Sequence, residues 1–284
     1  MSNNIPPFEL QMIIAHILGV SREYVLAHPE IELNSQQKKE YQKLIAKRLR
    51  HEPMAYILGH KEFYGLDFKV NKHTLIPRPE TELLVELVLE ELRIKNQVSD
   101  IIDVGTGSGN IIISLARNTK HETRNKINFY GIDISPKALS VAKQNAKAHK
   151  VDKKIRFIKS DLLEYFWKNK NSSLKIDNCK LIIVSNLPYL SEKIYSETLP
   201  DVKNFEPKSA LVSGPDGLDH YKKLFQQILG LKKSCFLFRV SCFVEISPEQ
   251  KSKIGSLIKK YFPDFKPEFK KDLAGKWRVV FFEI

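Results

Sequence analysis

The sequence contains little cysteine, with only Cys179, Cys235 and Cys242 among 284 residues. Their number is odd and no two form a C-x-x-C pair, so neither a disulfide framework nor a zinc site is supported. The eight histidines are scattered singly, without partners at metal-ligand spacing. We therefore expect buried free thiols and no bound metal.

Long apolar runs are also missing. No stretch approaches the roughly 18 consecutive apolar residues of a membrane span, and the N-terminus has no basic segment followed by a long apolar one. We expect a cytoplasmic protein without a membrane partner. A monomer is the default expectation.

Acidic residues are fewer than basic ones, 33 against 46, which gives a formal net charge of +13. An acidic partner such as nucleic acid would suit that charge. However, the basic residues are mostly lysine and are spread along the whole chain, as is typical of a solvated surface. Charge alone therefore identifies no partner.

The pattern of apolar residues divides the chain into three parts. Residues 1–52 show helical spacing and predict a small helical domain, and residues 53–78, rich in aromatic and β-branched residues, predict a β-hairpin linker. In residues 79–284, apolar strands at 99–105, 127–133, 155–161 and 181–186 alternate with helical stretches, including 110–118 and 136–148. Continuous apolar strands are buried on both faces, so the third part is predicted to be an α/β domain with a parallel, helix-covered sheet.

A glycine-rich turn follows the first of these strands. It begins at Asp103 and continues as Gly105-Thr106-Gly107-Ser108-Gly109 into a predicted helix. Such glycines let the backbone approach a ligand beside the amides of a helix N-terminus. The spacing is G-x-G-x-G rather than the dinucleotide G-x-G-x-x-G, and a plain structural turn would use glycine as well.

Two more aspartates end the next strands. Asp133 can accept the hydroxyls of a ribose, and Asp161 can accept an adenine amino group or cap the helix that follows it. Three consecutive strands that each end in an aspartate favour nucleoside binding, because ligands of open α/β sheets bind at this edge.

The fourth strand leads into Asn186-Leu187-Pro188-Tyr189. Taken alone, these residues would suit an ordinary strand-ending turn. After three nucleoside-compatible strands, a ligand-binding role is favoured, since the segment would project into the same crevice.

These residues resemble the Asn-Pro-Pro-Tyr motif of methyltransferases that act on planar nitrogens, with Leu187 in place of a proline. Over nearly its full length, the chain resembles the release factor N5-glutamine methyltransferases. The runs Pro53–Gly59 and Ile76–Glu82 carry that resemblance most strongly. It is poorer at 232–247, where we expect a lengthened or bulged fifth strand.

The resemblance implies a Rossmann-like domain with a seven-stranded, mostly parallel sheet and an antiparallel last strand. A hairpin would join it to an N-terminal domain that recognises the substrate. The implied reaction moves a methyl group from S-adenosylmethionine to the side-chain amide N5 of the glutamine in the Gly-Gly-Gln motif of peptide chain release factors. The implied cofactor-binding residues are Asp103, Gly105, Thr106, Gly107, Ser108, Gly109, Asp133, Asp161, Leu162 and Asn186.

The implied catalytic and substrate-binding residues are Asn186, Leu187, Pro188 and Tyr189. On the family's mechanism, the Asn186 side-chain oxygen and the Leu187 carbonyl accept the two amide hydrogens, while Pro188 and Tyr189 form an apolar wall. Catalysis is then mainly positioning for in-line attack. Pro188 biases Leu187 toward an extended conformation, so the acceptor should be kept.

The role of Arg78 and two alternative functions stay open. Arg78, a further candidate for substrate binding, would either orient a carboxylate or only pair with Glu80 or Glu82. The chain could be an adenine N6 methyltransferase of DNA or RNA, although its acid-containing N-terminal domain is not a basic groove. It could also be a catalytically inactive protein that binds S-adenosylmethionine.

Overall fold

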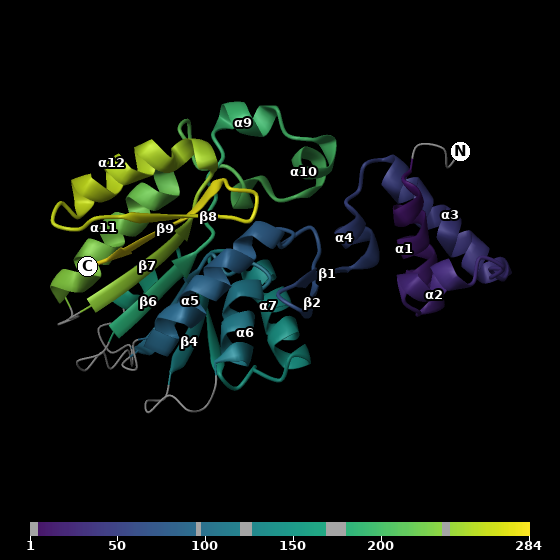
Figure 1. Cartoon of the computed structure of the whole chain (residues 1–284), viewed down its shortest axis with the longest axis horizontal. Coiled ribbons are helices and arrows are strands. Elements are labelled where there is room, and N and C mark those ends of the chain that lie inside the picture. The colour runs from purple at the N-terminus through teal and green to yellow at the C-terminus, as the bar shows by residue number, and fades with distance from the viewer. Residues whose placement is uncertain (1–4, 95–97, 120–126, 169–179, 235–238) are drawn as a thin grey trace.

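The computed structural model describes residues 5–94, 98–119, 127–168, 180–234 and 239–284. In Figure 1 a group of short helices lies to one side of a larger body that is built around a sheet. The helices of this group are α1 (Pro7–Leu18), α2 (Arg22–Ala27), α3 (Ser35–Leu49) and α4 (Met54–Leu58). Within the described ranges, no helix is long and apolar enough to cross a membrane.

Local sequence sets the ends of these helices. The side chain of Asn34 accepts from the backbone amide of Gln37, whose own side chain accepts from the Asn34 amide, and this reciprocal capping box starts α3. Gly19 ends α1 with a left-handed φ of 67°. The helices share a small core that includes Ile13, Leu44 and Ile57.

The linker is only partly a hairpin. Strands β1 (His60–Phe63) and β2 (Leu66–Lys69) pair antiparallel, as predicted, but residues 54–58 form helix α4. Pro53 precedes this helix and Gly59 follows it in a left-handed conformation with φ 80°, so the two residues delimit one helical turn. The hairpin prediction was therefore wrong for 54–58, and the domain limits at 52 and 78 stay predictions.

The sheet has seven strands and is mostly parallel, which confirms the predicted fold class. β9 runs antiparallel to both β7 and β8, whereas the other pairings in this sheet are parallel. In spatial order the strands are β5 (Ile155–Lys159), β4 (Asn128–Asp133), β3 (Val98–Val104), β6 (Lys180–Ser185), β7 (Arg239–Glu245), β9 (Trp277–Glu283) and β8 (Glu268–Lys271).

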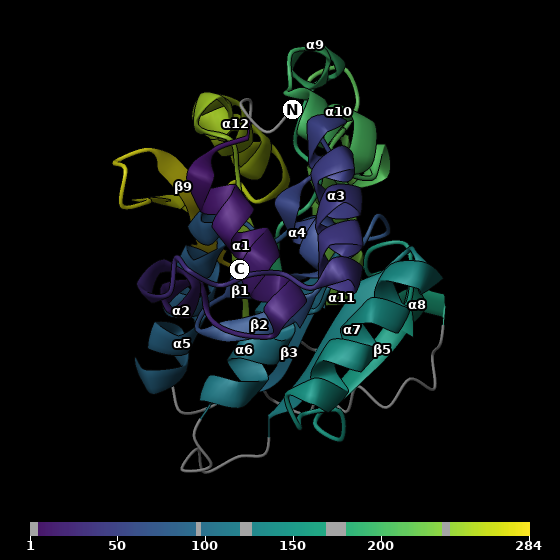
Figure 2. The ribbon, with the colours of Figure 1, turned by 90° about the vertical axis from the view of Figure 1, so that its right-hand side faces the viewer.

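Helices cover both faces of the sheet, as Figures 1 and 2 show. One face carries α5 (Glu82–Ile94), α6 (Asn110–Asn118) and α7 (Pro136–Ala148), and the other carries α8 (Glu164–Lys168), α11 (Asp219–Ser234) and α12 (Lys251–Tyr261). Neighbouring strand residues alternate between the two cores: Ile101 belongs to one core and Ile102 to the other. Short elements at the carboxyl edge are α9 (Glu192–Ser196), α10 (Pro200–Phe205) and the 3-10 turns η1 (Pro79–Thr81), η2 (Lys208–Ala210) and η3 (Pro248–Gln250).

The segment where the resemblance is poorer contains the end of α11 and all of β7. β7 keeps a continuous register with β6 and with β9, so the expected bulge is not found in its described residues. Residues 235–238, with Cys235, and residues 169–179, with Cys179, lie outside the described part of the chain. Cys242 is a buried free thiol, as predicted.

Candidate active site

A cavity of about 310 Å³ lies at the carboxyl ends of β3, β4 and β6. Among the residues that the structure describes, Asp103, Gly109 and Tyr189 are the predicted site residues that do not line it. Those that line it are Arg78, Gly105, Thr106, Gly107, Ser108, Asp133, Asp161, Leu162, Asn186, Leu187 and Pro188.

The glycine-rich turn is closed by its own backbone. Gly105 and Thr106 both donate to the Ile132 carbonyl at 2.8 Å, which joins the turn to the end of β4. Gly107 has φ 56°, and a Cβ built on it would meet only the Gly105 carbonyl oxygen, at 4.0 Å. The turn therefore presents bare backbone to the cavity.

Gly109 serves packing rather than the cavity. Its φ is 83°, and a Cβ built on it would lie 2.8 Å from Ile113 Cδ1 and 3.2 Å from Ala142 Cβ. The residue allows the start of α6 to pack closely on α7.

Asp133 connects the turn to the start of α7. Its Oδ2 accepts from the Gly107 amide at 2.9 Å and its Oδ1 accepts from the Ser135 amide at 2.8 Å. Burial raises the pKa of this carboxyl, and the backbone amides oppose that shift. The side chain is thus held in a fixed orientation on the cavity.

Asp103 lies behind the turn. It is 0% exposed, and its Oδ2 accepts from the Thr106 hydroxyl at 2.6 Å. Burial raises its pKa to about 7. Asp103 does not line the cavity itself, and it holds Thr106, which does; the structure therefore gives Asp103 a support position where the sequence predicted cofactor contact.

Asp161 lines the cavity and forms an ion pair with Lys223 of α11. Leu162 follows with φ 52°, an uncommon conformation for a residue with a branched side chain. The cavity surface at the end of β5 is therefore formed by a strained turn whose carboxylate already has a cationic partner.

The Asn-Leu-Pro-Tyr segment enters the cavity from the end of β6. Asn186 Nδ2 donates to Thr81 Oγ1 at 3.0 Å, which fixes the side-chain amide and turns Oδ1 away from Thr81. A Cβ built on Gly105 would come 3.0 Å from Leu187 Cδ2, so the glycine turn and the motif are in close contact. Thr81 was not predicted as a site residue, although it lies within the run Ile76–Glu82 that carries the family resemblance.

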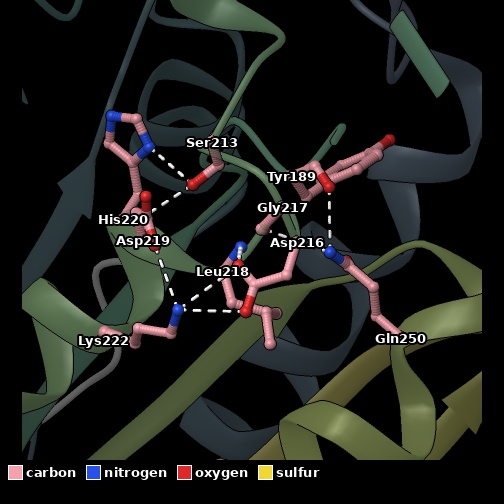
Figure 3. A network of polar contacts seen from close by, with 9 residues as sticks. All are labelled: Tyr189, Ser213, Asp216, Gly217, Leu218, Asp219, His220, Lys222 and Gln250. Atoms are coloured by element: carbon pink, nitrogen blue, oxygen red, sulfur yellow. Dashed lines mark hydrogen bonds and ion pairs between the residues drawn. The ribbon is translucent and has the colours of Figure 1, made fainter. Parts of the chain in front are cut away.

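Tyr189 is held outside the cavity. Its carbonyl accepts from Gln250 Nε2 at 2.8 Å, and the same nitrogen donates to the Gly217 carbonyl at 3.1 Å; Figure 3 shows Gln250 pointing at Tyr189. Its hydroxyl lies 3.4 Å from Glu245 Oε1. Burial raises the pKa of Tyr189, so its phenol stays protonated.

A histidine that sequence reasoning left without a role lines the cavity as well. His220 Nδ1 lies 2.7 Å from Ser213 Oγ, which also accepts from the His220 amide at 2.9 Å (Figure 3). Burial lowers the pKa of His220, which favours the neutral ring. A single histidine carries no sequence signal for such a position.

Arg78 pairs with neither of the predicted partners. It forms an ion pair with Glu206, which is 5% exposed and also accepts from the Ile76 amide at 3.0 Å. Glu82 accepts from the Tyr64 amide instead, at 2.8 Å. The alternative in which Arg78 pairs with Glu80 or Glu82 is therefore wrong; Arg78 orients a carboxylate, but one of its own chain.

Two family models match the chain. Residues 2–59 match the PrmC N-terminal domain, and residues 95–215 match a methyltransferase domain.

Close relatives cover nearly the whole chain. The release factor glutamine methyltransferase of Bacillus cereus is 36% identical over 280 residues, which are 96% of this chain and 91% of the relative. The release factor glutamine methyltransferase of Clostridium botulinum is 35% identical over 273 residues, 96% of this chain and 90% of the relative.

A solved structure of the N-terminal domain of human METTL16 in complex with SAH has a TM-score of 0.51 and 17% identity, and covers 99% of this chain and 95% of that one. At that identity the similarity shows the fold alone.

Proposed function

The chain belongs to the release factor glutamine methyltransferase family, and from that premise we propose that it methylates the side-chain amide N5 of the glutamine in the Gly-Gly-Gln motif of peptide chain release factors. The methyl donor is S-adenosylmethionine. The observation that carries the proposal is that Asn186, Leu187 and Pro188 line one cavity with the glycine turn and Asp133.

The residues that line the cavity suit this cofactor in their chemistry. Bare backbone at Gly107 leaves room for close approach, and the fixed Asp133 carboxylate can accept ribose hydroxyls. Asp161 and Leu162 follow β5 and line the same cavity, where they would contact the adenine. When bound, S-adenosylmethionine supplies an electrophilic methyl group on a sulfonium.

The motif residues hold the substrate amide. An amide nitrogen is a poor nucleophile because its lone pair is delocalised, so its two hydrogens must be held while the lone pair faces the methyl group. Because Asn186 Nδ2 is committed to Thr81, Oδ1 is the atom available to accept one of these hydrogens. The Leu187 carbonyl accepts the other.

The Leu187 carbonyl has one hydroxyl beside it. The Tyr221 hydroxyl lies 3.5 Å from the Leu187 oxygen and also donates to the Glu245 carbonyl. A carbonyl oxygen has two lone pairs, so one remains for the substrate. Two acceptors fixed before the substrate arrives lower the entropic cost of reaching the reactive geometry.

We propose the following for the partners and the location of the enzyme. The N-terminal helices recognise the release factor, and the enzyme acts as a monomer in the cytoplasm. Arg78 lines the cavity while paired with Glu206, and from that position it helps to bind the substrate. An adenine methyltransferase would share the motif, but the PrmC N-terminal match favours a protein substrate.

The test is to incubate the purified protein with S-adenosylmethionine and an unmodified bacterial release factor, and to measure methylation of the Gly-Gly-Gln glutamine by peptide mass spectrometry. Asn186→Ala should lower the rate by about a hundredfold or more, which corresponds to roughly 2.7 kcal/mol of lost transition-state stabilisation. Asn118→Ala, at the far end of α6, serves as the matched control and should keep the wild-type rate.

Two results would change the assignment. Methylated adenine in a nucleic-acid control, beside an unmodified release factor, would favour the adenine methyltransferase. Cofactor binding without transfer to either substrate would favour the inactive binding protein.

A further inference from the structure

A buried carboxylate stands directly behind the motif. Glu245 is the last residue of β7 and is 1% exposed. β6 and β7 are parallel and pair Ser185 with Val244, so the next residues along the two strands are Asn186 and Glu245. A charged group that is removed from water is destabilised unless it has partners. The contacts of Glu245 at this apolar strand end therefore indicate its role.

The first partner of Glu245 belongs to the motif. The Tyr189 hydroxyl lies 3.4 Å from Glu245 Oε1, while Oε2 has no hydrogen-bond partner among the described residues. One edge of the carboxylate therefore faces the ring that ends the motif.

The second partner reaches the motif indirectly. Thr81 lies near Glu245 and lowers the pKa of its carboxyl, and the Thr81 hydroxyl accepts from Asn186 Nδ2 at 3.0 Å. A threonine hydroxyl can accept one hydrogen bond and donate another at the same time. Thr81 therefore stands between Glu245 and Asn186, with its oxygen toward the Asn186 amide.

We propose that Glu245 is a positioning residue for methyl transfer, which holds Asn186 through Thr81 and Tyr189 through its hydroxyl. The inference rests on the proposed function, because it explains how the two ends of the motif are kept in register for an amide substrate. Glu245 itself is not placed on the cavity, so its role is exerted through these neighbours.

The ionisation of Glu245 should control this arrangement. Burial raises its pKa to about 7, and Thr81, Arg278 and Tyr189 oppose that shift. The other charged or titratable groups that act on it are Glu80, which raises its pKa, and Tyr221, whose own pKa is also raised by burial. Below about pH 7 the protonated carboxyl can itself donate a hydrogen bond, whereas above it the carboxylate only accepts, as it does from the Tyr189 hydroxyl. The transfer rate should therefore rise as pH increases through 7.

Glu245→Gln tests the inference, because it keeps the side-chain shape and removes the charge. We expect kcat with a release factor to fall about tenfold, the KM for S-adenosylmethionine to change less than twofold, and the component of the pH profile due to Glu245 to disappear. Asp100→Asn is the matched control. Asp100 is also a buried carboxylate, but it lies near the amino end of β3, away from the cavity at the carboxyl ends of the strands. It should leave kcat and the pH profile unchanged.

A measurement without substrate separates this inference from the proposed function. In protein with ¹³C-labelled tyrosine, the Tyr189 ring resonance, assigned with Tyr189→Phe, should shift with pH with a midpoint near 7. That shift should vanish in Glu245→Gln. A Tyr189 resonance that does not respond, or a variant with wild-type kcat, would overturn the role of Glu245. A responding resonance in a protein that leaves release factors unmodified would contradict the proposed function alone.

Discussion

The two sides of the cavity are held in place by different kinds of contact. On the glycine-turn side, the contacts join residues that are close in sequence: Asp103 and Thr106 are three residues apart, and Gly107 and Asp133 are 26 apart. On the motif side, Thr81 and Asn186 are 105 residues apart, and Tyr189 and Gln250 are 61 apart.

This difference indicates how each side can be altered. The glycine-turn side depends on the conformation of its own backbone and on two carboxylates, those of Asp103 and Asp133. The motif side depends on side chains from segments that meet only in the folded protein. Changes on the first side should affect cofactor affinity, whereas changes on the second should affect kcat.

Asp133→Ala should have the largest effect on the glycine-turn side. The carboxylate accepts from the Gly107 and Ser135 amides, and hydrogen bonds to a charged group contribute roughly 1.5–3 kcal/mol each. We expect S-adenosylmethionine to bind about a hundredfold more weakly in calorimetric titrations. Asp152→Ala, at an exposed turn, is the control. A change of less than about threefold for Asp133→Ala would mean that the backbone alone holds the turn.

Gly217→Ala should have a smaller effect, on the motif side. Gly217 has φ 75°, and a Cβ built on it would overlap the Tyr189 carbonyl oxygen and lie 2.7 Å from Gln250 Nε2. Displacing the motif should lower kcat about tenfold while the affinity for S-adenosylmethionine stays within twofold. The strained backbone should also cost roughly 1–3 kcal/mol of stability.

Gly275→Ala separates these two effects. Gly275 has the same φ of 75°, but a Cβ built on it would meet nothing within 4 Å. We expect Gly275→Ala to show only the loss of stability due to backbone strain in urea denaturation, with wild-type kcat. Equal losses of kcat in both variants would show that backbone strain, rather than contact with the motif, lowers the rate.

Much of the glycine-turn side could be predicted from the sequence. Strand ends, glycine spacing and the aspartates that follow each strand are local signals, and Asp133 and Asp161 line the cavity as expected. Asp103 also follows the pattern of an aspartate near a strand end, but its side chain is buried behind the turn. Whether such a side chain faces the cavity or the core is decided by packing, which the local sequence does not show.

The supports of the motif could not be predicted in the same way. Thr81 and Gln250 contact the motif across long stretches of sequence, and no local pattern pairs them with it. Glu245 gave the one usable signal: a glutamate between Val244 and Ile246 in an apolar strand is expected to be buried and to need partners. The helix at 54–58 was missed for a different reason, since five residues between Pro53 and Gly59 are too few to show helical periodicity.

The junction between the N-terminal helices and the methyltransferase domain should give the smallest effect. Arg48 Nη1 donates to Asp201 Oδ2 of α10 at 2.8 Å, while its other nitrogens donate to Glu9 of α1 at 2.6 and 3.1 Å. Asp201→Asn removes the charge that links the two parts and leaves the Glu9 pair intact. Because Asp201 is 30% exposed, we expect a stability loss of less than about 1 kcal/mol.

The same variant should show whether this junction serves the motif side. If the N-terminal helices present the release factor to the motif, Asp201→Asn should lower the methylation rate of a full-length release factor about two- to threefold. The affinity for S-adenosylmethionine should not change, because the junction does not contact the glycine turn. Glu40→Gln, which removes the exposed pair with Lys43 on α3, should affect neither property. A loss in Glu40→Gln as large as that in Asp201→Asn would mean that the charge of the helices matters and their attachment to α10 does not.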